Sequence, residues 1–161
     1  MSALQPLLLV LEGAEKARDD AKSDMEAARR AHEAARQQAQ SLHDWRQEYQ
    51  TRWQSQFRQS GGMEIVRCYQ DFIQRLADAI AEQDRRVEQT RAYMDRCREL
   101  LIERERKVAA VGQLIERRQQ EAALIQRRQE QKATDEMASR AGRVQSQGAG
   151  TGANQFSPNS F

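Results

Sequence analysis

A seven-residue repeat of apolar positions runs along most of the chain and predicts two long helices. In the first half the repeat consists mostly of alanine, and in the second half it consists mostly of larger aliphatic residues. Repeats of this period are typical of coiled coils, in which an apolar stripe on each helix meets its partner. The repeat positions are Leu7, Ala14, Ala21, Ala28, Ala35, Leu42 and Tyr49 in the first half, and Ile73, Ile80, Val87, Met94, Leu101, Val108, Ile115 and Ala122 in the second. The first stripe is flanked either by Val10, Ala17, Ala31 and Trp45 or by Leu11, Met25, Ala39 and Trp53, and the sequence does not choose between them.

Few helix-breaking residues interrupt these two halves. Pro6 fits the first turn of a helix, where its missing N–H costs nothing, and the interior pair Gly61-Gly62 fits a chain reversal. The next stop signal is Gly142, after which Gly, Ser, Gln and Asn dominate. We therefore expect an all-α fold, an elongated antiparallel two-helix coiled-coil hairpin in which the second helix is longer. The expected bounds are residues 1–141 for the hairpin, with helix one at about 7–58, a turn at 59–63 and helix two at about 64–141, and residues 142–161 for a disordered C-terminal tail.

The two stripes complement each other in size when the chain folds back on itself. Ala28 then faces Met94 and Ala21 faces Leu101, to within about one helical turn, so that small residues meet large ones. Polar residues on or beside this seam are expected to align the helices, with their stems along the seam and their heads in water. These residues are Gln38, Gln83, Arg104 and Arg118.

Helix two is expected to extend past its partner by ~26 residues, or ~39 Å at the rise of an α-helix. This segment, roughly residues 116–141, carries arginine pairs at 117–118 and 127–128 beside the apolar Leu124 and Ile125. An unpaired helix with an apolar strip frays alone and becomes ordered on a partner. The segment is therefore a candidate binding element.

The composition limits the possible functions. Charged residues make up 31% of the chain, aromatic residues 6%, and the net charge is +2, which argues against a thick globular core. Basic and acidic side chains alternate, so we expect no nucleic acid as a partner. The apolar run Leu7–Leu11 is too short to span a membrane and does not resemble a secretion signal. A cytoplasmic protein is the default expectation.

No group of residues suggests catalysis, and we expect no enzyme activity, no cofactor and no metal. His32 and His43 would lie ~16 Å apart on one helix, too far to share a metal ion, and are expected to be ordinary surface or boundary residues. Cys68 and Cys97 would lie ~43 Å apart on one helix and are expected to be reduced packing residues. The segment 148–152 lacks the Lys-Ser/Thr ending of a phosphate-binding loop.

Most large rings of the chain lie near the expected turn. A seam between two helices can cover only part of such a set, so the rings either cap the thick end of the hairpin or form an exposed ladder that binds a protein. The second interpretation is favoured, because Trp and Tyr are common anchors of binding surfaces. The set comprises Trp45, Tyr49, Trp53, Phe57, Tyr69 and Phe72.

Three short segments resemble the flagellar FliJ family of type III export proteins. They are Asp44-Trp45-Arg46-Gln47-Glu48-Tyr49, Tyr69-Gln70-Asp71-Phe72-Ile73-Gln74-Arg75-Leu76 and Ala79-Ile80-Ala81-Glu82-Gln83. A looser similarity extends to residues 14–16 and 132–136, so that the resemblance covers about Leu7 to Arg140. It implies an antiparallel two-helix coil similar to the central stalk of rotary ATPases.

The resemblance also implies partners. Such a protein binds the flagellar export ATPase hexamer through the terminal end of its coil, contacts the cytoplasmic domain of the export gate protein FlhA nearer the hairpin, and engages unloaded export chaperones. The implied gate-binding residues are Gln38, Leu42, Trp45, Tyr49, Phe72, Leu76, Ala79 and Gln83. Trp45 stands where a Tyr is expected and Gln83 where the pattern can carry His, which leaves the partner specificity open. For the ATPase the candidates are Leu7, Leu11, Arg117, Arg118, Leu124 and Ile125.

We therefore expect a non-enzymatic stalk and coupling protein, monomeric when isolated, cytoplasmic and peripheral to the inner membrane at the flagellar export apparatus. There are two alternatives, of which the first shares the predicted fold. One is the equivalent stalk of a virulence-type III secretion system, against which the Tyr-Gln-x-Phe-Ile block at residues 69–73 argues. The other is a generic coiled-coil scaffold or dimerisation module, and an obligate parallel dimer in solution would favour it over the hairpin.

Overall fold

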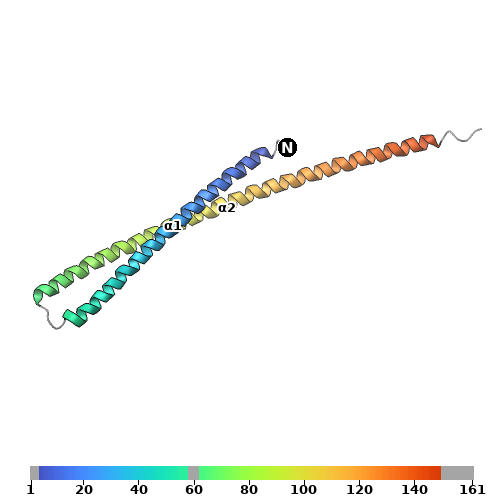
Figure 1. The fold of residues 1–161 in the computed structure, drawn as a ribbon. Coiled ribbons are helices and arrows are strands. Elements are labelled where there is room, and N and C mark those ends of the chain that lie inside the picture. Colours follow the sequence, from blue (N-terminus) through green and yellow to red (C-terminus); the bar gives the residue numbers. More distant parts are fainter. Residues whose placement is uncertain (1–3, 58–61, 150–161) are drawn as a thin grey trace, which may run out of the picture. The chain divides into compact units, whose positions relative to one another are not determined.

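The computed structural model describes residues 4–57 and 62–149. They form an α-helix α1 at Gln5–Arg52, a short π-helix η1 at Trp53–Phe57 and a second α-helix α2 at Met63–Gly148. Figure 1 shows the two long helices, and they confirm the all-α two-helix prediction. Helix formers such as Ala, Arg, Gln and Glu fill both segments, and neither has a proline past its first turn.

The helix ends agree with the sequence in part. Pro6 lies in the first turn of α1, as predicted. At the start of α2 the carbonyl oxygen of Gly62 accepts hydrogen bonds from the backbone N–H groups of Ile65 at 3.1 Å and Val66 at 3.3 Å. The expected tail is wrong in its first part, because α2 ends at Gly148 rather than before Gly142. A single glycine destabilises a helix by only about 1 kcal/mol, and good helix formers flank Gly142. Most of the expected turn, and residues 150–161 of the expected tail, lie outside the described residues.

The chain divides into one unit that ends at Val111 and another that begins at Gly112. In the first unit α1 runs antiparallel to the beginning of α2, as Figure 1 shows in blue to green and green to yellow. Their seam is built as the size pattern predicts, with small residues from α1 and larger ones from α2. Its buried residues are Ala14, Ala21, Ala28, Ala35 and Ala39 from α1 and Leu76, Ile80, Gln83 and Cys97 from α2.

The structure chooses between the two flanking rows that the sequence left open. Ala39 is buried and Met25 and Trp53 are half-buried, whereas Val10 is 48% exposed and Trp45 is 61% exposed. The row of Leu11, Met25, Ala39 and Trp53 therefore lies in the seam. The other row leaves Trp45 free for another role.

Contacts between the helices define the register. The imidazole Nδ1 of His32 lies 3.1 Å from the hydroxyl oxygen of Thr90, and the ring of Trp53 stacks on that of Tyr69 with 3.9 Å between their centroids. Both pairs fit the register that places Ala28 opposite Met94. The size complementarity of the two stripes is thus sufficient to predict how the helices align.

Gln83 differs from the expectation. Its side chain is 7% exposed, and its amide nitrogen donates a hydrogen bond to the carbonyl oxygen of Ala35 at 3.0 Å. The prediction that its polar head reaches water is therefore wrong. Small alanines on α1 leave room for the amide, and a buried amide is tolerated when a backbone group satisfies it. This bond ties the two helices at one position along the seam.

The two cysteines lie in different environments. Cys97 is buried, as expected of a packing residue, but Cys68 is exposed, so the packing prediction is wrong for Cys68.

We expect N-ethylmaleimide to modify Cys68 quickly in the folded protein and Cys97 only after denaturation, since thiol reactivity requires access. Mass spectrometry of digested protein, taken at short reaction times with and without urea, measures both rates. Equal rates at the two thiols in the folded protein would contradict the described seam.

Candidate protein-docking surface near the hairpin

The aromatic residues of α1 wind from solvent into the seam. Trp45, Tyr49 and Trp53 are spaced by four, and each step of four residues rotates ~40° around an α-helix. Their exposure falls accordingly: Trp45 is 61% exposed, Tyr49 is 38% exposed and Trp53 is half-buried. The end of this row coincides with the change from α-helix to the π-helix η1, a feature that frequently marks functional sites.

Aromatic rings near the end of α1 and in η1 contact rings near the beginning of α2. The Tyr49 ring lies 4.3 Å from the Phe72 ring, between centroids, and 6.1 Å from the Tyr69 ring. Tyr69 also stacks on Trp53, with an interplanar angle of 9°. Aromatic pairs of this kind contribute about 0.5–1.5 kcal/mol each beyond the area they bury. The four rings therefore form one continuous stack, which we call the ring stack, and it holds Tyr49 and Phe72 in fixed positions.

A surface cavity of about 240 Å³ opens beside the ring stack. Leu76, which is 8% exposed, contributes an apolar wall. At the rim a guanidinium nitrogen of Arg52 lies 2.8 Å from a carboxylate oxygen of Glu48. The lining residues are Trp45, Glu48, Tyr49, Arg52, Phe72 and Leu76. An apolar centre with a charged rim is the arrangement that accepts an anchoring side chain of a protein partner.

The structure brings only some of the predicted gate-binding residues together. Trp45, Tyr49, Phe72 and Leu76 line the same cavity. Of the others, Leu42 is half-buried, Gln38 and Ala79 are exposed, and Gln83 turns its amide inward. Glu48 and Arg52 were missed by the sequence analysis. Their spacing of four in a helix is the signal that could have identified the ion pair.

The predicted ATPase-binding residues lie in both units of the chain. Leu7 and Leu11, in the unit that ends at Val111, are half-buried. In the other unit Leu124 is 48% exposed and Ile125 is 55% exposed, and Arg117 and Arg118 are also exposed. All described residues from 116 to 149 are exposed. This part of α2 thus presents its apolar side chains to solvent.

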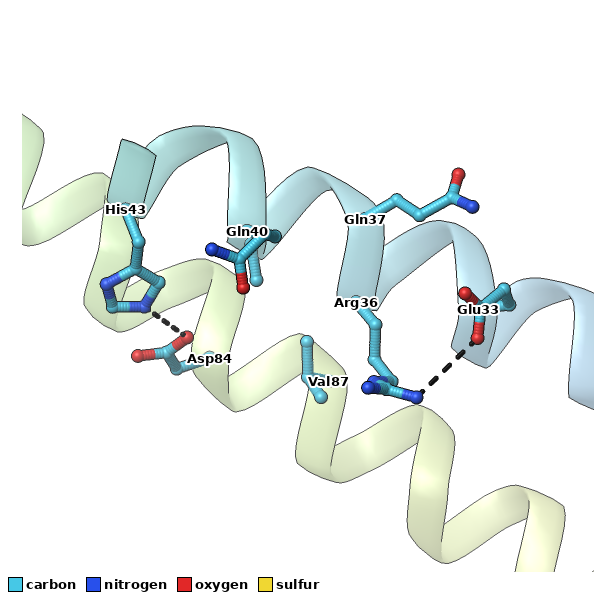
Figure 2. Close-up of a pocket in the computed structure, with 8 residues that line it drawn as sticks. Glu33, Arg36, Gln37, Gln40, His43, Asp84 and Val87 are labelled. Carbon is cyan, nitrogen blue, oxygen red and sulfur yellow. Dashed lines mark hydrogen bonds and ion pairs between the residues drawn. The ribbon is translucent and has the colours of Figure 1, made fainter. Parts of the chain in front are cut away.

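A polar cavity of about 350 Å³ lies farther along the seam, at residues 33–43 of α1. Figure 2 shows His43 pointing toward Asp84, and the imidazole Nε2 lies 3.3 Å from a carboxylate oxygen. Arg46 donates a hydrogen bond to the other nitrogen, Nδ1, at 3.3 Å. Since a guanidinium can only donate, Nε2 carries the proton that Asp84 accepts. The chain of three side chains bridges the helices, a role that the sequence did not reveal for this histidine.

The remaining charges around this cavity are paired as well. A guanidinium nitrogen of Arg36 lies 3.7 Å from a carboxylate oxygen of Glu33, also drawn in Figure 2. The lining residues are Glu33, Arg36, Gln37, Ala39, Gln40, His43, Asp84 and Val87. With its charges paired and few apolar side chains, this cavity offers a weaker anchor for a protein than the ring stack does.

The phenol of Tyr93 has a shifted pKa. A hydrogen bond with the side chain of Cys97 raises the pKa of Tyr93 above its usual value, and the carboxylate of Asp24 on α1 acts in the same direction. The phenol therefore stays protonated at neutral pH. Within residues 4–57 and 62–149, no three His, Cys, Asp or Glu side chains lie close enough together to hold a metal ion.

The described residues before Gly112 thus form an antiparallel helical hairpin with a partly exposed ring stack beside an apolar cavity. The family model described as Flagellar FliJ protein matches residues 2–147. The chain therefore belongs to the FliJ family, as its motifs indicated, and has a role in flagellar protein export. No curated protein and no solved structure matches the chain. No helix in the described part of the chain is long and apolar enough to cross a membrane.

Proposed function

We propose that this protein is a non-enzymatic stalk and coupling component of the flagellar type III export apparatus. It docks on the cytoplasmic domain of the export gate protein FlhA, binds the hexameric export ATPase, and assists the cycling of export chaperones. The observation that carries the proposal is the exposure of Trp45, Tyr49 and Phe72 around one apolar cavity, in a chain of the FliJ family.

The gate-docking surface is assigned to this cavity. Trp45 is 61% exposed and Phe72 is 43% exposed, so both rings present surface to solvent. Large exposed rings with a polar rim mark protein-binding sites. Leu76 forms the wall, and the adjoining Gln38, Leu42 and Ala79 extend the surface along the seam. Gln83 contributes by fixing the register rather than by direct contact, since its amide is bound to Ala35.

The ATPase is assigned to the exposed part of α2 after residue 115, with Leu7 and Leu11 of α1 as further candidates. A single exposed helix with apolar side chains is marginal in water and is ordered by a partner. A coil held in a ring of subunits can bias ATP hydrolysis if its contacts differ between the nucleotide states. The family match favours the flagellar branch over a virulence-type system.

Replacing Trp45 by Ala should weaken binding to the isolated cytoplasmic domain of the gate by about tenfold, which corresponds to ~1.4 kcal/mol. Phe72→Ala should act similarly. Because Trp45 is 61% exposed, Trp45→Ala should leave the helix content and the urea midpoint close to those of the unchanged protein. Phe72→Ala also removes the ring pair with Tyr49, so its free energy of unfolding should fall by about 0.5–1.5 kcal/mol. Titration calorimetry measures the affinity, and circular dichroism measures the folding.

A matched control is Tyr93→Ala, which removes a ring that is 51% exposed and lies away from the ring stack. This variant should bind the gate as the unchanged protein does. Normal binding by both Trp45→Ala and Phe72→Ala would exclude the cavity as the docking surface. Parallel loss of folding and binding would instead make the rings part of the core.

A further inference from the structure

A second cavity adjoins the first at the ring stack. Its volume is about 370 Å³, and Tyr49 lines both cavities. Trp53 and Tyr69 supply aromatic walls, and the rest comes from the first two turns of α2. The lining residues are Tyr49, Trp53, Glu64, Ile65, Cys68 and Tyr69. None of Glu64, Ile65 and Cys68 belongs to the gate-binding set that the family resemblance implies.

The walls of the second cavity continue the face of α2 that carries Phe72. Ile65, Cys68 and Phe72 are separated by three and four residues, the spacing of side chains on one helix face. Ile65 is 40% exposed, and Cys68 is also exposed. From Phe72 to Ile65 the helix rises by ~10 Å. The apolar surface thus extends toward the beginning of α2 without a break.

The usual size of a protein interface indicates how many residues around Phe72 a bound partner would cover. A stable interface covers about 800 Å² on each side, a patch ~30 Å across. A partner centred on Phe72 therefore also covers Ile65 and Cys68, which lie within ~10 Å of it along the helix. Because the two cavities share Tyr49, such a partner meets one surface rather than two separate ones.

We propose that the second cavity is part of the docking surface for the export gate and receives a second apolar side chain of that partner. Glu64 lies on its edge and favours a cationic residue beside that side chain. This inference rests on the proposed function, because it assigns the same partner to a larger site. It adds Ile65 and Cys68 to the contact residues, and it gives Tyr69 the role of a positioning residue that holds Tyr49 between the cavities.

Ile65→Asp tests the second cavity. Ile65 lies in the first turn of α2, where an acidic residue is favourable to the helix, so the variant should fold normally. Its affinity for the cytoplasmic domain of the gate should fall about fivefold by calorimetry. The matched control is Ile102→Asp, since Ile102 lies on the same helix with 41% exposure. That variant should bind within twofold of the unchanged protein.

Cys68 provides an independent readout in the full-length protein. At saturating concentrations of the gate domain, modification of Cys68 by N-ethylmaleimide should slow at least fivefold. If Trp45→Ala loses affinity while Ile65→Asp binds normally and Cys68 reacts at its free rate, the second cavity is not a docking site but the proposed function stands. If both variants bind normally, neither cavity is the docking surface for the gate. If the unchanged protein does not bind the gate domain at all, the proposed function fails as well. Protection of Cys68 that rises with the concentration of this protein alone would assign the cavity to a second copy and overturn the proposal.

Discussion

Replacing Ala28 by Glu should lower the free energy of unfolding by about 3 kcal/mol, because it places a carboxylate at the most buried alanine of the seam. Ala28 is 3% exposed, the lowest value along the alanine row. Its register partner is Met94, a large and half-buried residue, so a longer side chain at position 28 meets the Met94 side chain. The new carboxylate must either lose its hydration or push the helices apart.

Urea denaturation followed by circular dichroism measures this effect. With a slope of about 1–3 kcal/mol per molar urea, the midpoint should fall by at least ~1 M. The neighbouring Ala27 provides the control, since it is exposed on the same helix. Ala27→Glu should change the free energy of unfolding by less than about 0.5 kcal/mol. Equal effects of the two substitutions would mean that the alanine row does not form the seam in solution.

The same alanine row explains why much of the fold could be predicted from the sequence. The seven-residue period predicts which residues of each helix are buried, and the pairing of small with large residues predicts which residues of the two helices face each other. The choice between the flanking rows was not predictable, because both contain apolar residues of similar size. The burial of Ala39 and the exposure of Val10 and Trp45 distinguish the two rows in the structure.

Features that depend on single contacts were beyond the sequence pattern. The inward turn of the Gln83 amide depends on one backbone carbonyl, that of Ala35, lying open between small side chains. The bridge from His43 to Asp84 joins residues 41 positions apart, which no local pattern reveals. The π-helix η1 arises from a shift in backbone hydrogen bonding, and its residues carry no composition that signals it. The sequence therefore predicted the aromatic residues of the candidate site, but it did not predict the charged rim or the second cavity.

The double substitution Leu124→Ser with Ile125→Ser should reduce binding to the export ATPase by about a hundredfold and abolish any effect of the protein on ATP hydrolysis. The two side chains are 48% and 55% exposed, and no described residue from 116 to 149 is buried. Removing two apolar anchors from a helical interface costs about 1–2 kcal/mol for each, and ~2.7 kcal/mol corresponds to a hundredfold. Pull-down with the purified hexamer and the rate of phosphate release measure the two effects.

Control variants test the ATPase-binding segment and the gate-binding surface independently of each other. Gln119→Ser with Gln120→Ser makes the same serine pair at exposed polar positions of the same helix, and it should leave ATPase binding within twofold. The Leu124 and Ile125 double variant should still bind the gate domain normally, because the ring stack lies in the unit of the chain that ends at Val111. Full ATPase binding by this variant would remove the apolar strip after residue 115 from the proposal. Loss of gate binding in the same variant would mean that the two docking surfaces do not act independently, since a change on one then reaches the other.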